Sequence, residues 1–245
     1  MKRFGKKTFL IPLLSLFLGL GLLGAAAFAY ADDTKSEDRL SAEREIAACV
    51  QRGEELYAEM DVLPLELLAD RKGTDEINFS DAEKEQLLRE KNGLNEAYTG
   101  QKAASIRDKA EEVLSFYQKC LSDPAGEPLC IAVKTGVRDM ELSDYTVEGD
   151  QAQVTASGVV WSLWIEQYEP NGDYYVTMTV NRDTKKYQLA VQEGHWVIEG
   201  ITDHQKEFPP EEFVPEKARC ETLEEAIEAA GSVDTEAELA IADKM

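Results

Sequence analysis

Cysteine and histidine carry the most reactive side chains of this sequence, and both are few. Neither the cysteine spacing nor the number of imidazoles matches a zinc site. No pairing such as Cys130 with His195 has a recognisable nucleophile motif, and motifs of serine hydrolases, dinucleotide-binding proteins and P-loop NTPases are absent. We therefore expect no catalytic residue, metal or cofactor. The residues concerned are Cys49, Cys120, Cys130, Cys220, His195 and His204.

The first 31 residues predict the compartment. A cationic start, with lysine or arginine at positions 2, 3, 6 and 7, precedes an uncharged run rich in Leu, Phe, Gly and Ala. Small residues, Ala29 and Ala31, occupy the −3 and −1 positions of an export cleavage site, and two aspartates follow. We expect a secreted or cell-surface protein. An uncleaved signal anchor is the alternative, with a single membrane span and the rest of the chain outside.

Four cysteines in an exported chain favour two disulfides. Cys120 and Cys130 flank a segment in which Pro124, Gly126 and Pro128 favour chain reversal. The expected pairs are therefore Cys120–Cys130 and, by elimination, Cys49–Cys220. Free or buried thiols are the alternative.

Net charge limits the partners. Beyond the cationic start the chain has 22 basic and 48 acidic residues, a net charge of −26. Such a surface repels phosphodiester backbones and anionic lipid headgroups. We expect no nucleic-acid partner, and membrane contact only through the N-terminal segment.

Helical periodicity dominates residues 35–121. Apolar residues lie on one stripe of the stretch 46–60, a Ser80/Glu83 capping box predicts a second helix ending near Gly93, and the stretch 106–121 has one apolar face. The stripes comprise Ile46, Val50, Gly53, Tyr57 and Met60, then Ile106, Ala110, Val113, Leu114, Tyr117 and Leu121.

The period changes to two over residues 140–203, which predicts antiparallel strands. Turn signals at Gly149-Asp150, 170–173, Asp183-Thr184 and Glu193-Gly194 divide this region into about five or six strands. The fold class is therefore α+β, a domain of residues 32–208 with helices packed on the sheet. Residues 209–245 form an acidic segment, docked or trailing, with a short helix that starts at a Thr222/Glu225 capping box.

Gly158 separates two patterns in the strand 151–167. Apolar residues are even-numbered before it and odd-numbered after it. Because a one-residue shift moves side chains to the other face, Gly158 is the predicted bulge or bend. We expect the sheet to contribute to one core through Trp161, Leu163, Tyr187, Leu189, Val191 and Trp196.

Helices followed by a bent meander resemble the cone-shaped nuclear-transport-factor-2-like superfamily. The stretch from Tyr145 to Asp203, with 147–154, 185–189 and 193–198 as its pieces, is similar to the accessory module found ahead of putative amidase domains in exported Gram-positive proteins. An acidic segment follows this stretch, so we expect the module without an amidase domain. Fold analogy does not carry function.

The resemblance also implies where a site would lie. Enzymes of this superfamily use acids, His or Tyr inside the cone, and the nearest candidates are Asp203 and His204, with Trp164 and Tyr168 on the less apolar face of the bent strand. As a dipeptide, Asp203-His204 is interpreted as a solvated strand end.

Two functions follow. The first is an exported non-catalytic accessory or binding module for a protein, peptide or cell-wall component, and the alternative is a small-molecule pocket enzyme or ligand carrier. A filled interior favours the first, and an open cavity with convergent polar groups favours the second.

Overall fold

The computed structural model describes residues 39–69, 80, 82, 93–123, 126–209 and 213–242. The chain forms two compact units, Met1–Glu45 and Ile46–Met245, and the sheet and all helical residues from Ile46 onward belong to the second. The signal segment with Ala29 and Ala31, and nearly all of the predicted helix 80–92, lie outside the described residues.

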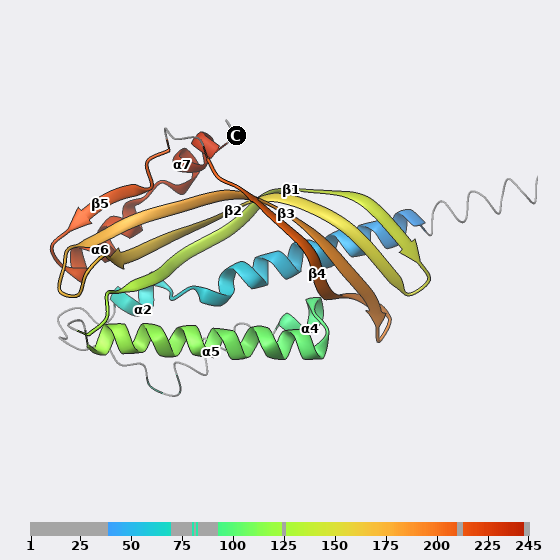
Figure 1. The fold of residues 1–245 in the computed structure, drawn as a ribbon, viewed down its shortest axis with the longest axis horizontal. Coiled ribbons are helices and arrows are strands. Elements are labelled where there is room, and N and C mark those ends of the chain that lie inside the picture. Colours follow the sequence, from blue (N-terminus) through green and yellow to red (C-terminus); the bar gives the residue numbers. More distant parts are fainter. Residues whose placement is uncertain are drawn as a thin grey trace, which may run out of the picture. The chain divides into compact units, whose positions relative to one another are not determined.

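Helices precede the sheet in the sequence, and two of them are long. A helix over residues 39–58 continues into the 3-10 helix η1 (Glu59–Asp61), and α5 spans Gly100–Ser122, with the short α2 (Leu65–Ala69) and α4 (Leu94–Ala97) between them (Figure 1). The predicted stripe of the first helix is buried except at Tyr57, which stays 37% exposed. The Thr99 side chain accepts a hydrogen bond from the Lys102 amide and caps α5.

Long antiparallel strands follow. β1 (Cys130–Glu148), β2 (Gln151–Gln167), β3 (Tyr174–Gln192) and β4 (His195–Glu207) pair in sequence order. β4 pairs with β3 from residue 182 onward, and β5 (Glu216–Cys220) pairs with residues 174–177 of β3. The predicted α+β class, with helices N-terminal to an antiparallel sheet, is confirmed.

The buried face of β2 changes at Gly158. Buried positions are even-numbered from 152 to 158 and odd-numbered from 159 to 167, as the sequence pattern predicts. The expectation of one core is wrong, because this switch divides the buried side chains between two clusters. Trp161 and Leu163 pack in a cluster with α2, α5 and α6, whereas Tyr187, Leu189 and Trp196 pack in a cluster with the helix 39–58, α4 and α5.

A bulge accompanies this switch, and it lies in β1. The β1–β2 register shifts between Arg138 and Glu141, where Asp139 has a φ of 52°. The pairing of β2 with β3 runs through Gly158 without a shift. Gly158 faces the bulge, since a Cβ built on it would lie 3.4 Å from the Arg138 carbonyl oxygen and from the Met140 Cα.

β3 does not turn at Asp183-Thr184. It runs unbroken from Tyr174 to Gln192, so two predicted strands are one. The polar run that includes Asp183 and Lys185 suggested a turn, but both residues are buried, 6% exposed each, and their side chains are paired inside the fold.

The four cysteines are free thiols, so the two expected disulfides are not formed. Cys49 packs against one buried cluster and Cys220 belongs to the other, which separates the Cys49–Cys220 pair. Cys120, near the end of α5, and Cys130, at the start of β1, are brought near each other by the predicted reversal. A disulfide also requires a specific Cβ–Cβ separation, which residue spacing does not encode.

The C-terminal segment is docked. α6 (Leu223–Ser232) and α7 (Thr235–Ala242) contribute Ala226, Ile227 and Leu239 to the cluster that contains Leu163. The Thr222 side chain caps α6 by accepting from the Glu225 amide, as predicted, and the Glu225 carboxylate accepts from the Glu221 amide. Within the described part of the chain, no helix is both long and apolar enough to cross a bilayer.

Candidate functional site

Three charged side chains are buried where the helix 39–58 meets β3. Glu54 on the helix is 5% exposed, and Asp183 and Lys185 on β3 are 6% exposed. Lys185 lies two residues after Asp183, so both project from the same face of the strand. Burial of charge is costly unless the charges are paired and hydrogen-bonded, and the geometry supplies both.

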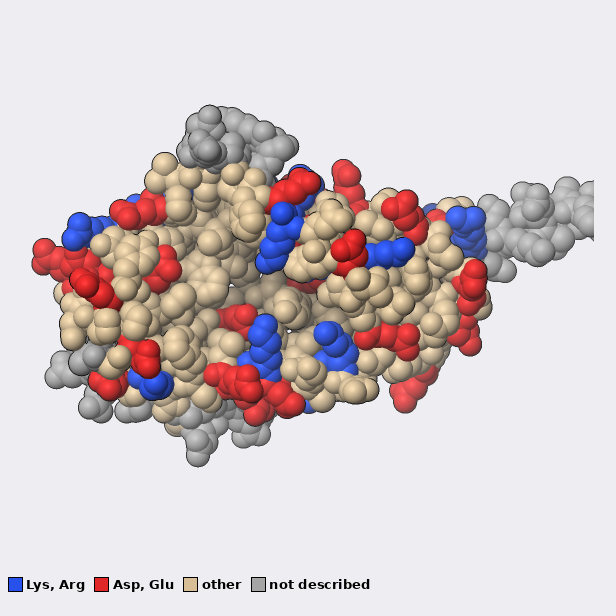
Figure 2. All heavy atoms as spheres, viewed as in Figure 1, with Lys and Arg blue, Asp and Glu red and all other residues tan. Residues whose placement is uncertain are grey.

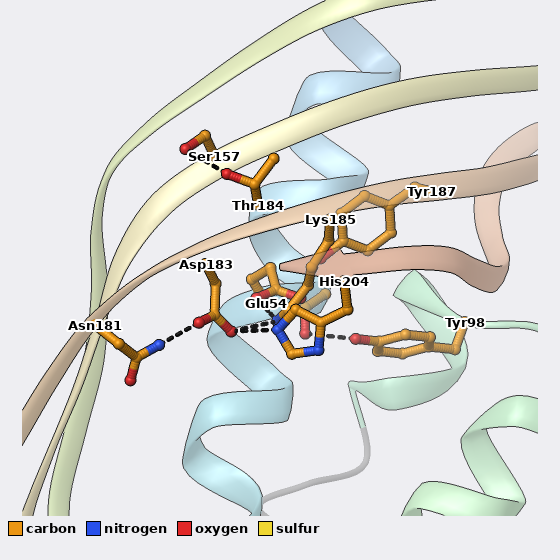
Figure 3. Close-up of polar contacts among 10 residues, drawn as sticks. Glu54, Tyr98, Ser157, Asn181, Asp183, Thr184, Lys185, Tyr187 and His204 are labelled. Carbon is orange, nitrogen blue, oxygen red and sulfur yellow. Dashed lines mark hydrogen bonds and ion pairs between the residues drawn. The ribbon is translucent and has the colours of Figure 1, made fainter. Parts of the chain in front are cut away.

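Lys185 lies between the two carboxylates (Figure 3). Its Nζ is 2.5 Å from Glu54 Oε2 and 3.5 Å from Asp183 Oδ2. The Tyr187 hydroxyl donates to the other Glu54 oxygen, and the Asn181 amide donates to Asp183 Oδ1. Each carboxylate therefore has partners on both oxygens.

His204 completes this network from the neighbouring strand. His204 on β4 lies opposite Lys185 in the pairing with β3. Its imidazole is hydrogen-bonded to Asp183, with Nε2 2.8 Å from Oδ2. The His204 side chain is 38% exposed, against 7% for Asp183. A carboxylate that bonds one ring nitrogen fixes the orientation of the imidazole and leaves its other nitrogen for a further partner.

Two buried tyrosines support the helix side of the network. The Tyr98 hydroxyl donates to the Gly53 carbonyl oxygen at 2.8 Å, next to Glu54 in the chain. Burial, followed by the Glu54 charge, raises the pKa of Tyr98 and of Tyr187 well above the usual tyrosine range. Both phenols therefore stay protonated and act as donors.

A cavity of about 310 Å³ opens beside this network. We call it the polar cavity, and Figure 2 shows a hollow near the centre of the molecular face, bordered by acidic and basic side chains. Its walls come from the end of the helix 39–58, η1 and the four long strands. The lining residues are Glu54, Tyr57, Ala58, Asp61, Ala132, Thr135, Val160, Ser162, Trp164, Thr179, Asn181, Asp183, Lys185, His204 and Lys206.

The four predicted binding residues separate into two groups. Trp164 and His204 line the polar cavity. Asp203 follows the opposite alternation of β4 and is exposed. The interpretation of Asp203-His204 as a solvated strand end is therefore wrong for His204, which is hydrogen-bonded to Asp183. Tyr168 is 64% exposed and stacks on Tyr175, with ring centroids 4.4 Å apart.

Sequence reasoning missed Glu54, Asp183 and Lys185. Glu54 follows Gly53 on the buried side of its helix, and an acid beside an apolar stripe was a usable signal. Asp183 and Lys185 continue the period-two alternation that leads to Tyr187 and Leu189. The turn interpretation interrupted that alternation and placed them in solvent.

The site does not have the composition of a metal centre. Within the described ranges, no group of three or more His, Cys, Asp or Glu side chains could hold a metal ion. Lys185 also lies between the two buried carboxylates, where a cation would bind. What the arrangement offers chemically is an oriented imidazole and several hydrogen-bonding groups around a small volume.

Comparison with known proteins identifies no family for this chain. No protein-family model matches the chain, and no curated protein is significantly similar to it. Among solved structures, the intermembrane-space region of the chloroplast protein ARC6 is similar over 58% of this chain and 92% of that one, with 13% identity and a TM-score of 0.33. Similarity at this level carries no argument about function.

Proposed function

We propose that this chain is an exported ligand carrier, a non-catalytic module that holds a small polar molecule in the polar cavity. One observation carries the proposal: side chains from the helix 39–58, β2, β3 and β4 converge on one open volume of about 310 Å³. This volume is at the small end of the roughly 300–1,000 Å³ typical of ligand sites. An open cavity with convergent polar groups favours a small ligand over a partner bound only on the surface.

The fixed arrangement of the buried charged side chains also supports the proposed binding function. Glu54, Asp183 and Lys185 hold each other in fixed positions, so the groups that face the cavity are oriented before a ligand arrives. Such rigidity lowers the ordering cost of binding. A buried charge network is not itself a source of stability, so a binding role gives a reason for its presence.

Export remains part of the proposal and rests on the N-terminal sequence. An exported carrier or accessory module would meet nutrients, wall fragments or signals outside the membrane. The acidic exterior, with a net charge of −26 beyond the cationic start, keeps such a protein soluble and away from anionic lipids. The resemblance to the cone-shaped superfamily is consistent with a pocket but names no ligand.

A pocket enzyme is the second candidate function, and the pairing of His204 with Asp183 favours it. An imidazole held by a carboxylate at 2.8 Å and facing a cavity is an arrangement used in general acid–base catalysis. Chemistry would then depend on the free nitrogen of His204. A His204→Gln variant that binds normally but loses turnover would identify the enzyme.

The test blocks the cavity and compares matched variants of one helix. Ala58 lines the polar cavity, whereas Ala48 is exposed on the same helix. Ligand-observed NMR with cocktails of small polar metabolites should detect binders of the native protein. Ala58→Phe should abolish their signals and Ala48→Phe should retain them, with similar melting temperatures. Absence of any binder, or equal binding by both variants, would contradict the proposal.

A further inference from the structure

Three of the charges that line the polar cavity, those of Glu54, Asp183 and Lys185, are already compensated within the protein. Lys185 neutralises Glu54 at 2.5 Å, and Asp183 accepts hydrogen bonds from Asn181 and His204 and lies 3.5 Å from Lys185. A charged ligand entering the site would lose hydration without gaining an uncompensated buried counterion. Net neutrality is therefore the first property of a suitable ligand.

An amine ligand is further disfavoured, because the chain supplies its own. The Lys185 ammonium lies against Glu54 and 5.7 Å from the centroid of the Tyr57 ring. A carboxylate and an aromatic face are the two groups that would recognise an ammonium. Lys185 fills that position.

Anions fit the site no better. The lining contains the carboxylates of Glu54, Asp61 and Asp183 against the ammonium groups of Lys185 and Lys206. The surrounding acidic surface adds repulsion. Phosphate and carboxylate ligands are therefore disfavoured both inside the cavity and as they approach it.

What remains is a wall of neutral hydrogen-bonding groups beside an aromatic ring. Thr135 and Ser162 from β1 and β2, with Thr179 and Asn181 from β3, line the same volume, and hydroxyl and amide groups both donate and accept. The Trp164 indole donates to the Thr179 hydroxyl at 3.1 Å. This contact uses the edge of the indole and leaves its face for packing.

We infer that the ligand of the polar cavity is a neutral polyhydroxylated molecule, a mono- or disaccharide. Sugar hydroxyls both donate and accept, so they match the Thr, Ser and Asn lining and the free nitrogen of His204. The C–H groups of a sugar ring carry slight positive charge and pack on the negative face of an aromatic ring such as Trp164. This inference rests on the proposed small-ligand function and names its ligand class.

Calorimetric titration of the purified full chain tests the class. The sugar probes are glucose, galactose, N-acetylglucosamine, its β-1,4 disaccharide, maltose and cellobiose, and the charged probes are spermidine and inorganic phosphate. We expect at least one sugar to bind and both charged probes to fail. Trp164→Ala should weaken sugar binding by about tenfold or more, since it removes both packing area and an aromatic contact.

Matched variants distinguish the loss of a contact with the sugar from a general loss of folding. Trp164→Phe keeps an aromatic face and should weaken binding less than Trp164→Ala. Asn181→Leu should also weaken binding because it removes a polar wall group. Phe116→Ala, at an exposed aromatic residue on α5, should leave binding unchanged.

The outcomes distinguish the two claims. If spermidine, phosphate or another metabolite binds in the cavity and no sugar does, the saccharide inference is wrong and the binding function stands. If sugars bind equally to native protein and to Trp164→Ala, the sugar site lies elsewhere and the inference fails. If neither sugars nor metabolite cocktails bind, both claims fail.

Discussion

At the scale of single residues, the two phenols beside Glu54 link the site to the stability of the fold. Burial raises the pKa of Tyr187 and of Tyr98, whereas an unfolded chain releases phenolic protons near pH 10. The native state therefore holds these protons more tightly than the unfolded state. Their contribution to stability is complete below about pH 10 and is lost as the pH rises above it.

Replacing one phenol should reduce this alkaline loss. Each such tyrosine contributes a slope of up to about 1.4 kcal/mol per pH unit above pH 10. Tyr187→Phe should unfold more easily at pH 8, because Glu54 loses a donor, but its free energy of unfolding should fall less steeply from pH 10 to 11. Urea titrations at pH 8, 9, 10 and 11 measure both. Equal slopes for the variant and the native protein would count against the assignment.

Cys49 gives a second prediction at this scale. Burial raises the pKa of its thiol to about 11, and its Sγ donates to the Ala97 carbonyl oxygen. Because the thiolate is the reactive form, iodoacetamide at pH 8 should modify Cys49 slowly in the folded protein and promptly in urea. Peptide mapping by mass spectrometry gives the rate at each cysteine.

The same experiment tests the absence of disulfides. All four cysteines should be alkylated in urea without a reductant, as their free state requires. A Cys120–Cys130 peptide that resists alkylation until reduction would restore the sequence-based expectation. Rapid modification of Cys49 in the native protein would contradict the burial of its thiol.

At the scale of elements, one glycine sets how closely the helix 39–58 approaches β4. A Cβ built on Gly53 would lie 2.5 Å from Ile198 Cδ1 and 3.3 Å from the Tyr98 hydroxyl, and Ile198 is fully buried. Overpacking costs about 1–3 kcal/mol, more than the roughly 1 kcal/mol that Ala gains over Gly in a helix. Gly53→Ala should therefore lower the free energy of unfolding.

Gly100→Ala is the matched control on α5. No atom lies within 4 Å of a Cβ built there, so the substitution should leave stability unchanged or raise it by up to about 1 kcal/mol. Chemical denaturation of both variants measures the difference. A loss in Gly100→Ala equal to that in Gly53→Ala would remove the close approach as its cause.

Secondary-structure features were predictable from the sequence where residues close together in the chain determine them. The Thr222 cap and the change of buried face at Gly158 follow from hydrogen-bonding capacity and side-chain alternation within a few residues. Asp183 was misassigned because a polar run resembles a turn unless its distant partners are known. One of those partners is Glu54, which is 131 residues from Lys185 in the chain and reaches it only through packing. The sequence therefore predicted Trp164 and His204 in the cavity wall but not the buried charges beside them.

At the scale of the whole molecule, charge and the N-terminal segment together predict its location. The four cationic residues of the chain's first 31 residues stand apart from an acidic remainder, and cationic segments stay on the cytoplasmic side. A saccharide-binding module would also find free sugars and wall glycans outside the membrane. We therefore expect export with cleavage after Ala31.

Two substitutions test the cleavage. Ala31→Phe places a bulky residue at the −1 position and should leave the precursor intact in the membrane, whereas Tyr30→Phe at the more tolerant −2 position should be processed normally. Mass spectrometry of the protein from a bacterial host should find an N-terminus at Asp32 outside the cytoplasmic membrane. Intact native chain in the membrane would select the anchor with its domain outside, and intact chain confined to the cytosol would contradict export itself. The second result would also leave the proposed saccharide site without access to extracellular glycans.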